Sequence, residues 1–149
     1  MRFLILSAFL TMGATLFSQE KVQWSIKAVK AQNNLTNIQI QAEIQSGWHV
    51  YSVKTPENSG PIPISFALNK NRAVKKKGDF MEKSEAIKKF DANFDSDVFI
   101  FEHKFLGELN VKVKKDTELI TVVTYMVCNE VMCLPPIDHL LSIKLHTNE

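Results

Sequence analysis

Hydrophobic and polar residues alternate along much of the chain. In four stretches, residues 22–28, 38–44, 109–113 and 141–145, apolar side chains occupy every second position. Because successive side chains of a β-strand point to opposite faces, this alternation puts one face of each strand against a core and the other face in water. A fifth stretch, residues 119–127, is rich in β-branched residues, which favour strands. The pattern therefore predicts strands in all five stretches.

Turn-forming residues separate the predicted strands. They cluster at residues 33–34, 46–47, 59–61, 77–79 and 114–116. Pro56, Pro61 and Pro63 predict a long connection or a sheet edge at residues 54–65, because proline cannot donate to a central ladder. The only stretch that suits a helix, residues 81–89, is short and suits an ordered loop equally well.

Several strands with polar outer faces and little helix predict an all-β fold, an antiparallel β-sandwich of immunoglobulin-like type. The 149 residues, 45% of them hydrophobic, suffice for one domain with a real core. The 18 basic and 16 acidic residues leave a formal charge of +2, which is too small for a nucleic-acid-binding protein. Two cysteines are too few for a disulfide-dense scaffold.

The N-terminal residues 1–18 predict an export signal. Arg2 gives a positive start, and an uncharged apolar run follows as far as Phe17. This run is shorter than the roughly 20 residues that a membrane-spanning helix needs. An uncleaved anchor or a lipoprotein is the alternative, although no cysteine lies at the boundary to carry a lipid. We expect cleavage after Ser18, a single mature domain at residues 19–149, and a periplasmic or secreted location.

Cys128 and Cys133 are the candidates for chemistry. A turn between them can bring their Cα atoms within the roughly 4.4–6.8 Å that a disulfide needs. A closed loop of about six residues constrains the unfolded chain by only about 2 kcal/mol, so the bridge suits a disulfide that is made and broken. Pro135 and Pro136 oppose a following helix, so no helix dipole lowers the thiol pKa. We expect the pair to react when it is presented to another protein's activated thiol.

Two other readings of the pair remain open at this point. Cysteine pairs in secreted proteins are often purely structural disulfides. A metal site at Cys128, Cys133 and His139 would need a fourth ligand, and no second cysteine pair supplies one. The sequence contains no nucleophile–His–acid set and no Gly-rich phosphate loop. We therefore expect no cofactor, no metal and no small-molecule substrate.

Three segments resemble one known family, the N-terminal periplasmic domain of the thiol:disulfide interchange protein DsbD, also called the disulfide bond corrector domain. Residues 125–136, with both cysteines and the paired prolines, resemble its active-site segment. Residues 47–51 resemble its Gly-aromatic-x-x-Tyr strand, and residues 79–85 resemble its acidic-aromatic loop ending in Lys-Ser-Glu. The similarity extends over roughly residues 22–146.

The resemblance implies a reversible disulfide between Cys128 and Cys133. It implies a protein thiol–disulfide oxidoreductase that takes electrons from a membrane-embedded or thioredoxin-like donor and delivers them to oxidised thioredoxin-like periplasmic proteins. By analogy, Cys133 is the attacked sulfur. The sequence ends at Glu149 without the family's membrane conduit, so we expect donor and acceptor to be separate chains, with membrane contact only through a partner protein.

The resemblance also implies an aromatic cap over the cysteines. Phe80 matches the cap position, Asp79 the acidic position beside it, and Tyr51 and Trp48 match aromatics near the site. A ring over the sulfurs blocks the approach of a foreign thiolate until a partner displaces it. Trp48 suits a core position better than a site position, and without the resemblance Phe80 suits the core as well as the cap. The rival hypothesis for the whole chain is a secreted immunoglobulin-like binding or assembly module with a permanent bridge.

Overall fold

The computed structural model describes residues 20–147, so the predicted signal at residues 1–18 lies outside the described part of the chain. The described residues form eleven strands, one short 3-10 helix and no α-helix. The elements are β1 (Val22–Ala31), β2 (Leu35–Ile44), β3 (His49–Tyr51), η1 (Glu57–Ser59), β4 (Ser65–Leu68), β5 (Val74–Glu82), β6 (Ile87–Asp91), β7 (Ser96–Glu102), β8 (Lys104–Val113), β9 (Thr117–Tyr125), β10 (Val127–Cys128) and β11 (Ile137–Leu145).

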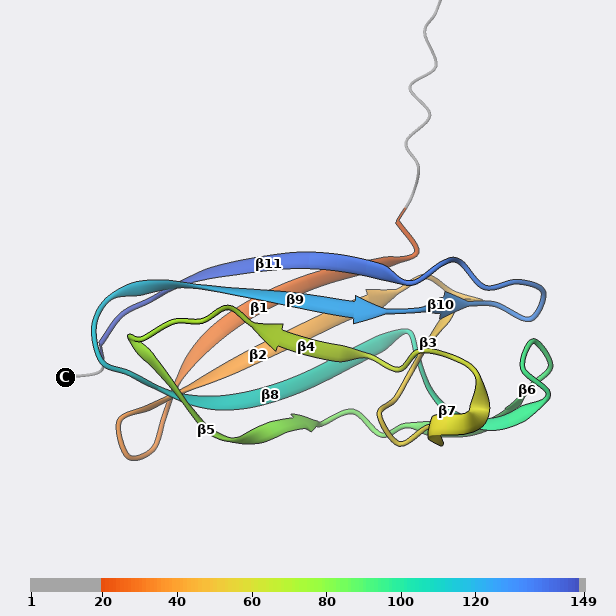
Figure 1. Ribbon diagram of the computed structural model, residues 1–149, viewed down its shortest axis with the longest axis horizontal. Helices are drawn as coiled ribbons and strands as arrows, with labels where there is room; N and C mark the ends of the chain where they lie inside the picture. Colours follow the sequence, from red (N-terminus) through yellow and green to blue (C-terminus); the bar gives the residue numbers. More distant parts are fainter. Residues whose placement is uncertain (1–19, 148–149) are drawn as a thin grey trace, which may run out of the picture.

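Two antiparallel sheets form the sandwich. One sheet has the strand order β1-β2-β8-β5 and the other has the order β11-β9-β4 (Figure 1). The main core cluster contains buried side chains from β1, β2, β8, β9 and β11, so it lies between the two sheets. The prediction of an all-β, antiparallel sandwich of immunoglobulin-like type is confirmed, and all five predicted strands are present.

Alternation of burial along β2 and β8 shows why these strands face the core on one side. Every second residue from Thr36 to Ile44 and from Phe105 to Val113 is buried. Trp24 lies at the centre of the aromatic packing. Its ring centroid is 5.2 Å from that of Tyr125, 5.8 Å from that of Phe105 and 6.3 Å from that of Phe66. The apolar pattern of the sequence thus becomes one continuous core.

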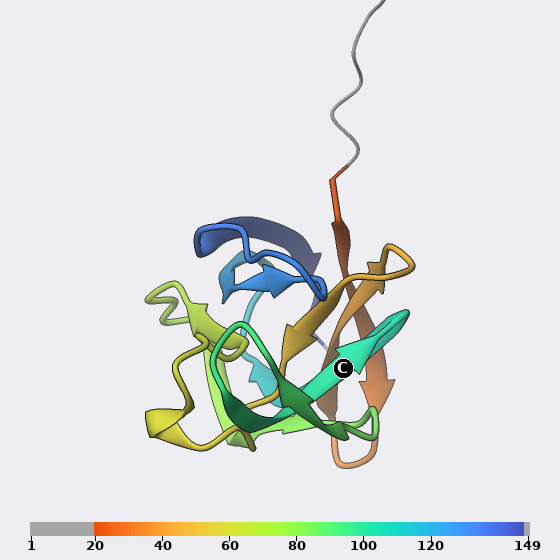
Figure 2. The same cartoon turned by 90° about the vertical axis from the view of Figure 1, so that its right-hand side faces the viewer.

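A third sheet, of order β10-β3-β7-β6, lies at one end of the sandwich. It is built from continuations of the sandwich strands. β7 passes into β8 through His103, whose positive φ of 63° turns the chain, and β10 follows β9 after Met126. Figure 2 views the molecule from this end, where the β6–β7 hairpin and the segment after β10 both lie. The two cysteines are therefore at the end of the molecule.

Two local expectations are wrong. Residues 81–89 form no helix, because β5 continues to Glu82 along β8 and β6 begins at Ile87. The turn signal at residues 77–79 lies inside β5 and forms a bulge, since the register to β8 shifts between Lys77 and Met81. Gly78 has a φ of +85°, which suits a bulge. The expected long connection at residues 54–65 is present as far as residue 64, with only η1 inside it, and β4 begins at Ser65.

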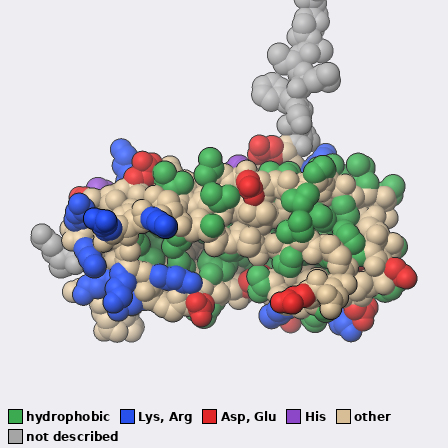
Figure 3. Space-filling model, viewed as in Figure 1, with side chains coloured by type: hydrophobic (Ala, Val, Ile, Leu, Met, Phe, Trp, Pro, Cys, Tyr) green, Lys and Arg blue, Asp and Glu red, His purple; other side chains and the backbone are tan. Residues whose placement is uncertain are grey.

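Basic side chains gather at the end of the sandwich opposite the third sheet (Figure 3). Lys75 on β5 and Lys112 on β8 are cross-strand partners there, and both are exposed. The run of three lysines that begins at Lys75 therefore lies far from the cysteines along β5. Within the described residues, no helix has both the length and the apolar character needed to cross a bilayer.

Candidate functional site

A tight hairpin brings the two cysteines together. β10 ends at Cys128, and Leu134 N–H donates to the Val127 carbonyl at 2.9 Å. The side-chain oxygen of Asn129 accepts hydrogen bonds from the backbone N–H groups of Val131 and Met132, at 2.9 and 2.8 Å. Asparagine favours such turns because its side chain replaces a backbone partner. Hydrogen bonds within the hairpin therefore close the turn between the cysteines.

The hairpin holds a disulfide whose two sulfurs differ in exposure. The Cys128–Cys133 Sγ atoms are 2.02 Å apart and the Cα atoms are 4.0 Å apart. Cys128 is fully buried, whereas Cys133 is partly exposed. Cys128 belongs to a second, smaller core cluster with Tyr51, Val98 and Ile100. An incoming thiolate needs a direct approach to sulfur, so Cys133 is the more accessible target.

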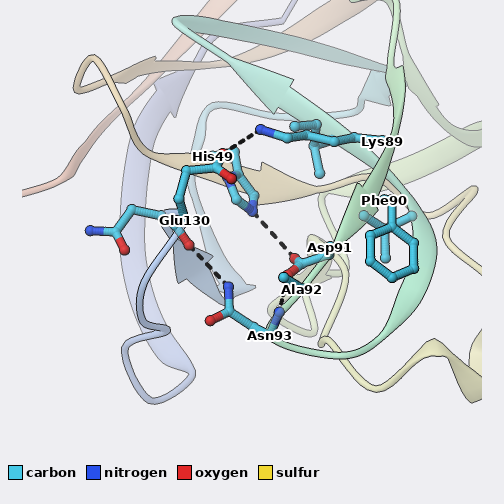
Figure 4. Close-up of a pocket in the computed structure, with 10 residues that line it drawn as sticks. His49, Lys89, Phe90, Asp91, Ala92, Asn93 and Glu130 are labelled. Atoms are coloured by element: carbon cyan, nitrogen blue, oxygen red, sulfur yellow. Dashed lines mark hydrogen bonds and ion pairs between the residues drawn. The ribbon is translucent and has the colours of Figure 1, made fainter.

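A buried polar group adjoins Cys133. Tyr51 Oη is 3.9 Å from Cys133 Sγ and donates a hydrogen bond to Asp91 Oδ2 at 2.6 Å. His49 Nε2 is 3.1 Å from Tyr51 Oη and 3.5 Å from Asp91 Oδ2. His49 and Tyr51 share a face because they are two positions apart on β3. Figure 4 shows His49 turned toward Asp91.

Burial and hydrogen bonding shift the pKa values of this group. Burial lowers the pKa of His49, although the Asp91 charge opposes that effect. Burial alone would raise the pKa of Asp91, but hydrogen bonds from Tyr51 and Asn93 outweigh burial and hold the pKa below its usual value. Burial and the neighbouring Asp91 raise the pKa of Tyr51. At neutral pH the group therefore contains a neutral imidazole, a carboxylate and a phenol.

The β6–β7 hairpin covers this group. Its turn is fixed by Asp91, whose Oδ1 accepts the Asn93 N–H at 2.8 Å. Asn93 Nδ2 in turn donates to the Asn129 carbonyl at 3.0 Å, which joins this turn to the cysteine hairpin. Phe94 is half-buried and packs against the second cluster, with its ring centroid 6.1 Å from that of Tyr51. An aromatic ring therefore lies at the cluster that contains the disulfide.

Phe80, the cap residue expected from the sequence, lies elsewhere. Its ring stacks on Phe66, with centroids 3.9 Å apart, and packs against the main core cluster. A Cβ atom at Gly107 would be only 1.9 Å from Phe80 Cζ, so Phe80 occupies the space that this glycine leaves on β8. Pairing of β5 with β8 places Phe80 in the sandwich, while Cys128 lies in the third sheet.

Tyr51 is the only one of the four predicted neighbours that the described structure brings to the cysteines. Asp79 is exposed and forms an ion pair with Lys76 at 3.2 Å. Trp48 packs against the main cluster, and the Lys21 ammonium lies 5.2 Å from its ring centroid. The acidic residue beside the site is Asp91.

Three site residues were missed from the sequence: His49, Asp91 and Phe94. His49 had a signal, because it lies two positions before Tyr51 in a predicted strand and so on the same face. Asp91 and Phe94 had a weaker one, an Asp/Asn-rich turn around an aromatic residue. Nothing in the local sequence connects that turn to cysteines more than thirty positions away.

Comparison with protein families identifies the class of this domain. The sequence model for the N-terminal domain of the thiol:disulfide interchange protein DsbD matches residues 14–145. The chain belongs to this family. Family membership and the bonded cysteine pair support thiol–disulfide exchange. Comparison with curated protein sequences found no match for this chain.

Solved structures of similar fold include DsbD N-terminal domains and a domain of another protein, ScsB. The DsbD N-terminal domain of Neisseria meningitidis in its reduced form is 18% identical, with a TM-score of 0.56 over 84% of this chain and 90% of that chain. The N-terminal periplasmic domain of ScsB from Proteus mirabilis is 16% identical, with a TM-score of 0.63 over 87% of this chain and 49% of that chain.

A third structure contains a complex. It holds the DsbD N-terminal and PilB N-terminal domains of Neisseria meningitidis; the match is 17% identical, with a TM-score of 0.54 over 85% of this chain and 89% of that chain. At these identities the structural matches show a shared fold.

Proposed function

We propose that this domain relays electrons between a reductant protein and an oxidised, thioredoxin-like partner in the periplasm, through a reversible Cys128–Cys133 disulfide. A donor thiolate attacks Cys133 Sγ, the bond to Cys128 breaks, and Cys128 leaves as a thiolate. The donor's second thiol then attacks its own sulfur in the mixed disulfide and releases Cys133. The donor becomes a disulfide, the domain gains two electrons as a dithiol, and the reverse steps reduce the acceptor.

The observation that carries this proposal is the unequal exposure of the two sulfurs within a short local ring. Cys133 is partly exposed at the end of the molecule, whereas Cys128 is fully buried behind it. A structural staple gains most when it closes a long loop, and this ring closes only five positions. One accessible sulfur and one protected sulfur suit ordered attack and resolution.

Phe94 is the residue that we propose as the shield of the disulfide, in place of Phe80. Its half-buried ring packs against the second cluster, as Cys133 does, and its hairpin is joined to the cysteine hairpin through Asn93 and Asn129. Lys89 on β6 also forms an ion pair with Glu130. These contacts link the two hairpins at exposed positions, where a docking protein can reach and displace them.

Exposed apolar residues beside Cys133 support a protein partner. Val131 and Met132 are 84% and 47% exposed, and they form the tip of the cysteine hairpin. Apolar side chains at an interface contribute through burial, and methionine adapts to partner surfaces. A DsbD N-terminal domain forms a complex with a PilB N-terminal domain, which supports a protein partner for this domain as well. The ScsB domain's description as periplasmic supports the same location here.

A redox titration tests the proposal. The purified domain is equilibrated with glutathione or thioredoxin buffers of known potential, and the dithiol fraction is counted by alkylation and mass spectrometry. A midpoint above about −300 mV supports exchange with cellular thiols. A pair that stays oxidised well below that potential contradicts the relay and supports the alternative, a binding or assembly module with a structural bridge.

A further inference from the structure

A continuous chain of polar atoms leads from Cys133 into the protein. The Sγ atom is 3.9 Å from Tyr51 Oη, and Tyr51 Oη is 3.1 Å from His49 Nε2. The side chains of Tyr51, His49 and Asp91 are at most 5% exposed. Burial of three polar side chains costs free energy that hydrogen bonding must offset, so a simpler apolar packing would stabilise the fold as well.

We propose that His49 holds the proton of the exchange reaction at Cys133, acting through the Tyr51 hydroxyl. This inference rests on the thiol–disulfide exchange proposed above and adds a residue to it. Tyr51 contacts the reacting sulfur, and His49 acts through Tyr51 as a positioning and proton-holding residue.

The proton transfer balances in both directions. With His49 as the Nδ1–H tautomer, Nε2 is free to accept a proton. When the reduced Cys133 attacks a partner disulfide, the Tyr51 hydroxyl turns from Asp91 to His49 and its proton passes to Nε2, while the Cys133 S–H proton passes to Tyr51 Oη. The sulfur keeps its electron pair and forms the new S–S bond, and the partner's second sulfur leaves as a thiolate. When Cys133 is later displaced as a thiolate, the same two transfers run backwards and protonate it.

His49 suits this role better than its two neighbours. Burial and the hydrogen bond to Asp91 both make the phenol of Tyr51 retain a proton. Tyr51 can therefore pass a proton on, but it does not remain as a phenolate. Asp91 is held as a carboxylate by its hydrogen bonds. An imidazole is the side chain that changes charge near neutral pH, and the Asp91 carboxylate 3.5 Å away stabilises the imidazolium that forms.

Charged groups from three directions face His49. These are Asp91 and Lys89 of β6, Glu102 of β7, which is the cross-strand partner of His49, and Glu130 of the cysteine hairpin. Lys89 opposes an imidazolium, but it forms ion pairs with both Glu102 and Glu130. A small cavity beside His49, lined also by Lys89 and Glu130, is at the lower limit of the space that one water molecule needs (Figure 4).

The rate of thiol exchange as a function of pH tests the inference. The reduced mature protein is mixed with the aromatic disulfide dithiobis-nitrobenzoate from about pH 5.5 to about pH 10, and thiolate release is followed by stopped flow. The wild-type rate should level off above the pKa of His49. In His49→Gln, which replaces the imidazole with an amide that forms hydrogen bonds but does not take up a proton, the rate should rise about tenfold per pH unit until the thiol itself is ionised. It should be about 100-fold lower at pH 7 and should approach the wild type near pH 9.

Controls separate proton transfer from a structural effect. His146→Gln removes a histidine that pairs with Asp116 at the far end of the chain and should keep the wild-type profile. Tyr51→Phe breaks the connection and should reproduce the His49→Gln profile; if either variant fails to fold, the other decides. The inference is overturned if the His49→Gln rate is lower than the wild-type rate by the same factor at every pH. It is also overturned if the wild-type rate rises tenfold per pH unit throughout. If instead the wild-type pair cannot be reduced above about −300 mV, the proposed function itself fails.

Discussion

The ring of Phe94 lies directly against the backbone of Gly60. A Cβ atom at Gly60 would be 2.5 Å from Phe94 Cδ1, which is closer than real Cβ contacts. Gly60 also has a φ of +98°, a conformation that other residues adopt at a cost. Gly60 follows η1 in the long connection between β3 and β4. The position of the proposed shield therefore depends on this connection as well as on its own hairpin.

Gly60→Ala should displace Phe94 and expose the disulfide. The added methyl group overlaps the ring, and the positive φ adds strain of about 1–2 kcal/mol. We expect a several-fold faster reduction of the disulfide by dithiothreitol, measured by quenched alkylation. Gly47→Ala is the matched control, because Gly47 has a φ of +80° but nothing within 4 Å of its Cβ position. Equal reduction rates in both variants would contradict the proposal that the contact between Gly60 and Phe94 helps to shield the disulfide.

Phe94→Ala should change the reactivity of the disulfide, whereas Phe80→Ala should change the stability of the fold. Phe94→Ala should speed the reaction of the disulfide with small thiols about tenfold, because the ring no longer restricts access to Cys133. Phe80→Ala should leave that rate unchanged and lower the free energy of unfolding by about 2–4 kcal/mol, because it empties the space over Gly107. Reduction kinetics and urea unfolding measure the two effects. A faster reaction in Phe80→Ala alone would restore the sequence-based assignment.

The two single-cysteine variants should trap partners unequally. Cys128→Ala leaves the partly exposed Cys133, which should form mixed disulfides with periplasmic proteins. Cys133→Ala leaves the fully buried Cys128, and we expect at least about tenfold less trapping. Non-reducing gels of affinity-purified protein provide the measurement, with the double variant as the background. Stronger trapping by Cys133→Ala would reverse the assignment of the attacked sulfur.

Asn129→Ala should make the disulfide easier to reduce. Its side-chain oxygen closes the turn by accepting two backbone hydrogen bonds, so its loss should weaken ring closure by about 1 kcal/mol. For a two-electron couple this raises the reduction potential by about 20 mV. A glutathione titration resolves such a shift when both proteins are equilibrated in the same buffers. Asn58→Ala, in the exposed connection between β3 and β4, is the control and should leave the potential unchanged.

The free energy of unfolding should fall as the pH is lowered below the pKa of an ordinary histidine. The unfolded chain protonates His49 near pH 6.5, while the folded protein resists protonation because burial lowers the pKa. The unfolded state therefore binds more protons below pH 6.5, and each pKa unit of difference costs about 1.4 kcal/mol. Asp91 adds a further loss below its ordinary pKa of 3.8, since its folded pKa is also lowered.

Urea unfolding between about pH 5 and about pH 7.5 should show this loss in the wild type and a smaller slope in His49→Gln. His139→Gln, on β11 and outside the buried polar group, should keep the wild-type slope. Parallel curves for the wild type and His49→Gln would mean that His49 does not titrate differently in the folded state.

The sequence was sufficient for the fold because burial in a sandwich repeats every two residues. The alternation around Ile40 and Val111 predicted both strand positions and core faces. It failed between Lys77 and Ile87, where a glycine inside a bulge resembles a turn and an edge strand carries few apolar residues. The local spacing also allowed a Cys128–Cys133 disulfide, and the side chain of Asn129 closes the turn between the two cysteines.

Only the tertiary structure decided which of two phenylalanines, Phe80 or Phe94, packs against the cluster that contains Cys128. Phe80 and Phe94 both follow an acidic residue closely, and the sequence offers no physical reason to prefer one. Strand pairing made the choice: β5 pairs with β8 over Gly107 and buries Phe80 in the sandwich, whereas β6 and β7 pair in the third sheet beside β3 and β10. Such long-range pairing depends on the whole core, so local residue patterns do not contain it.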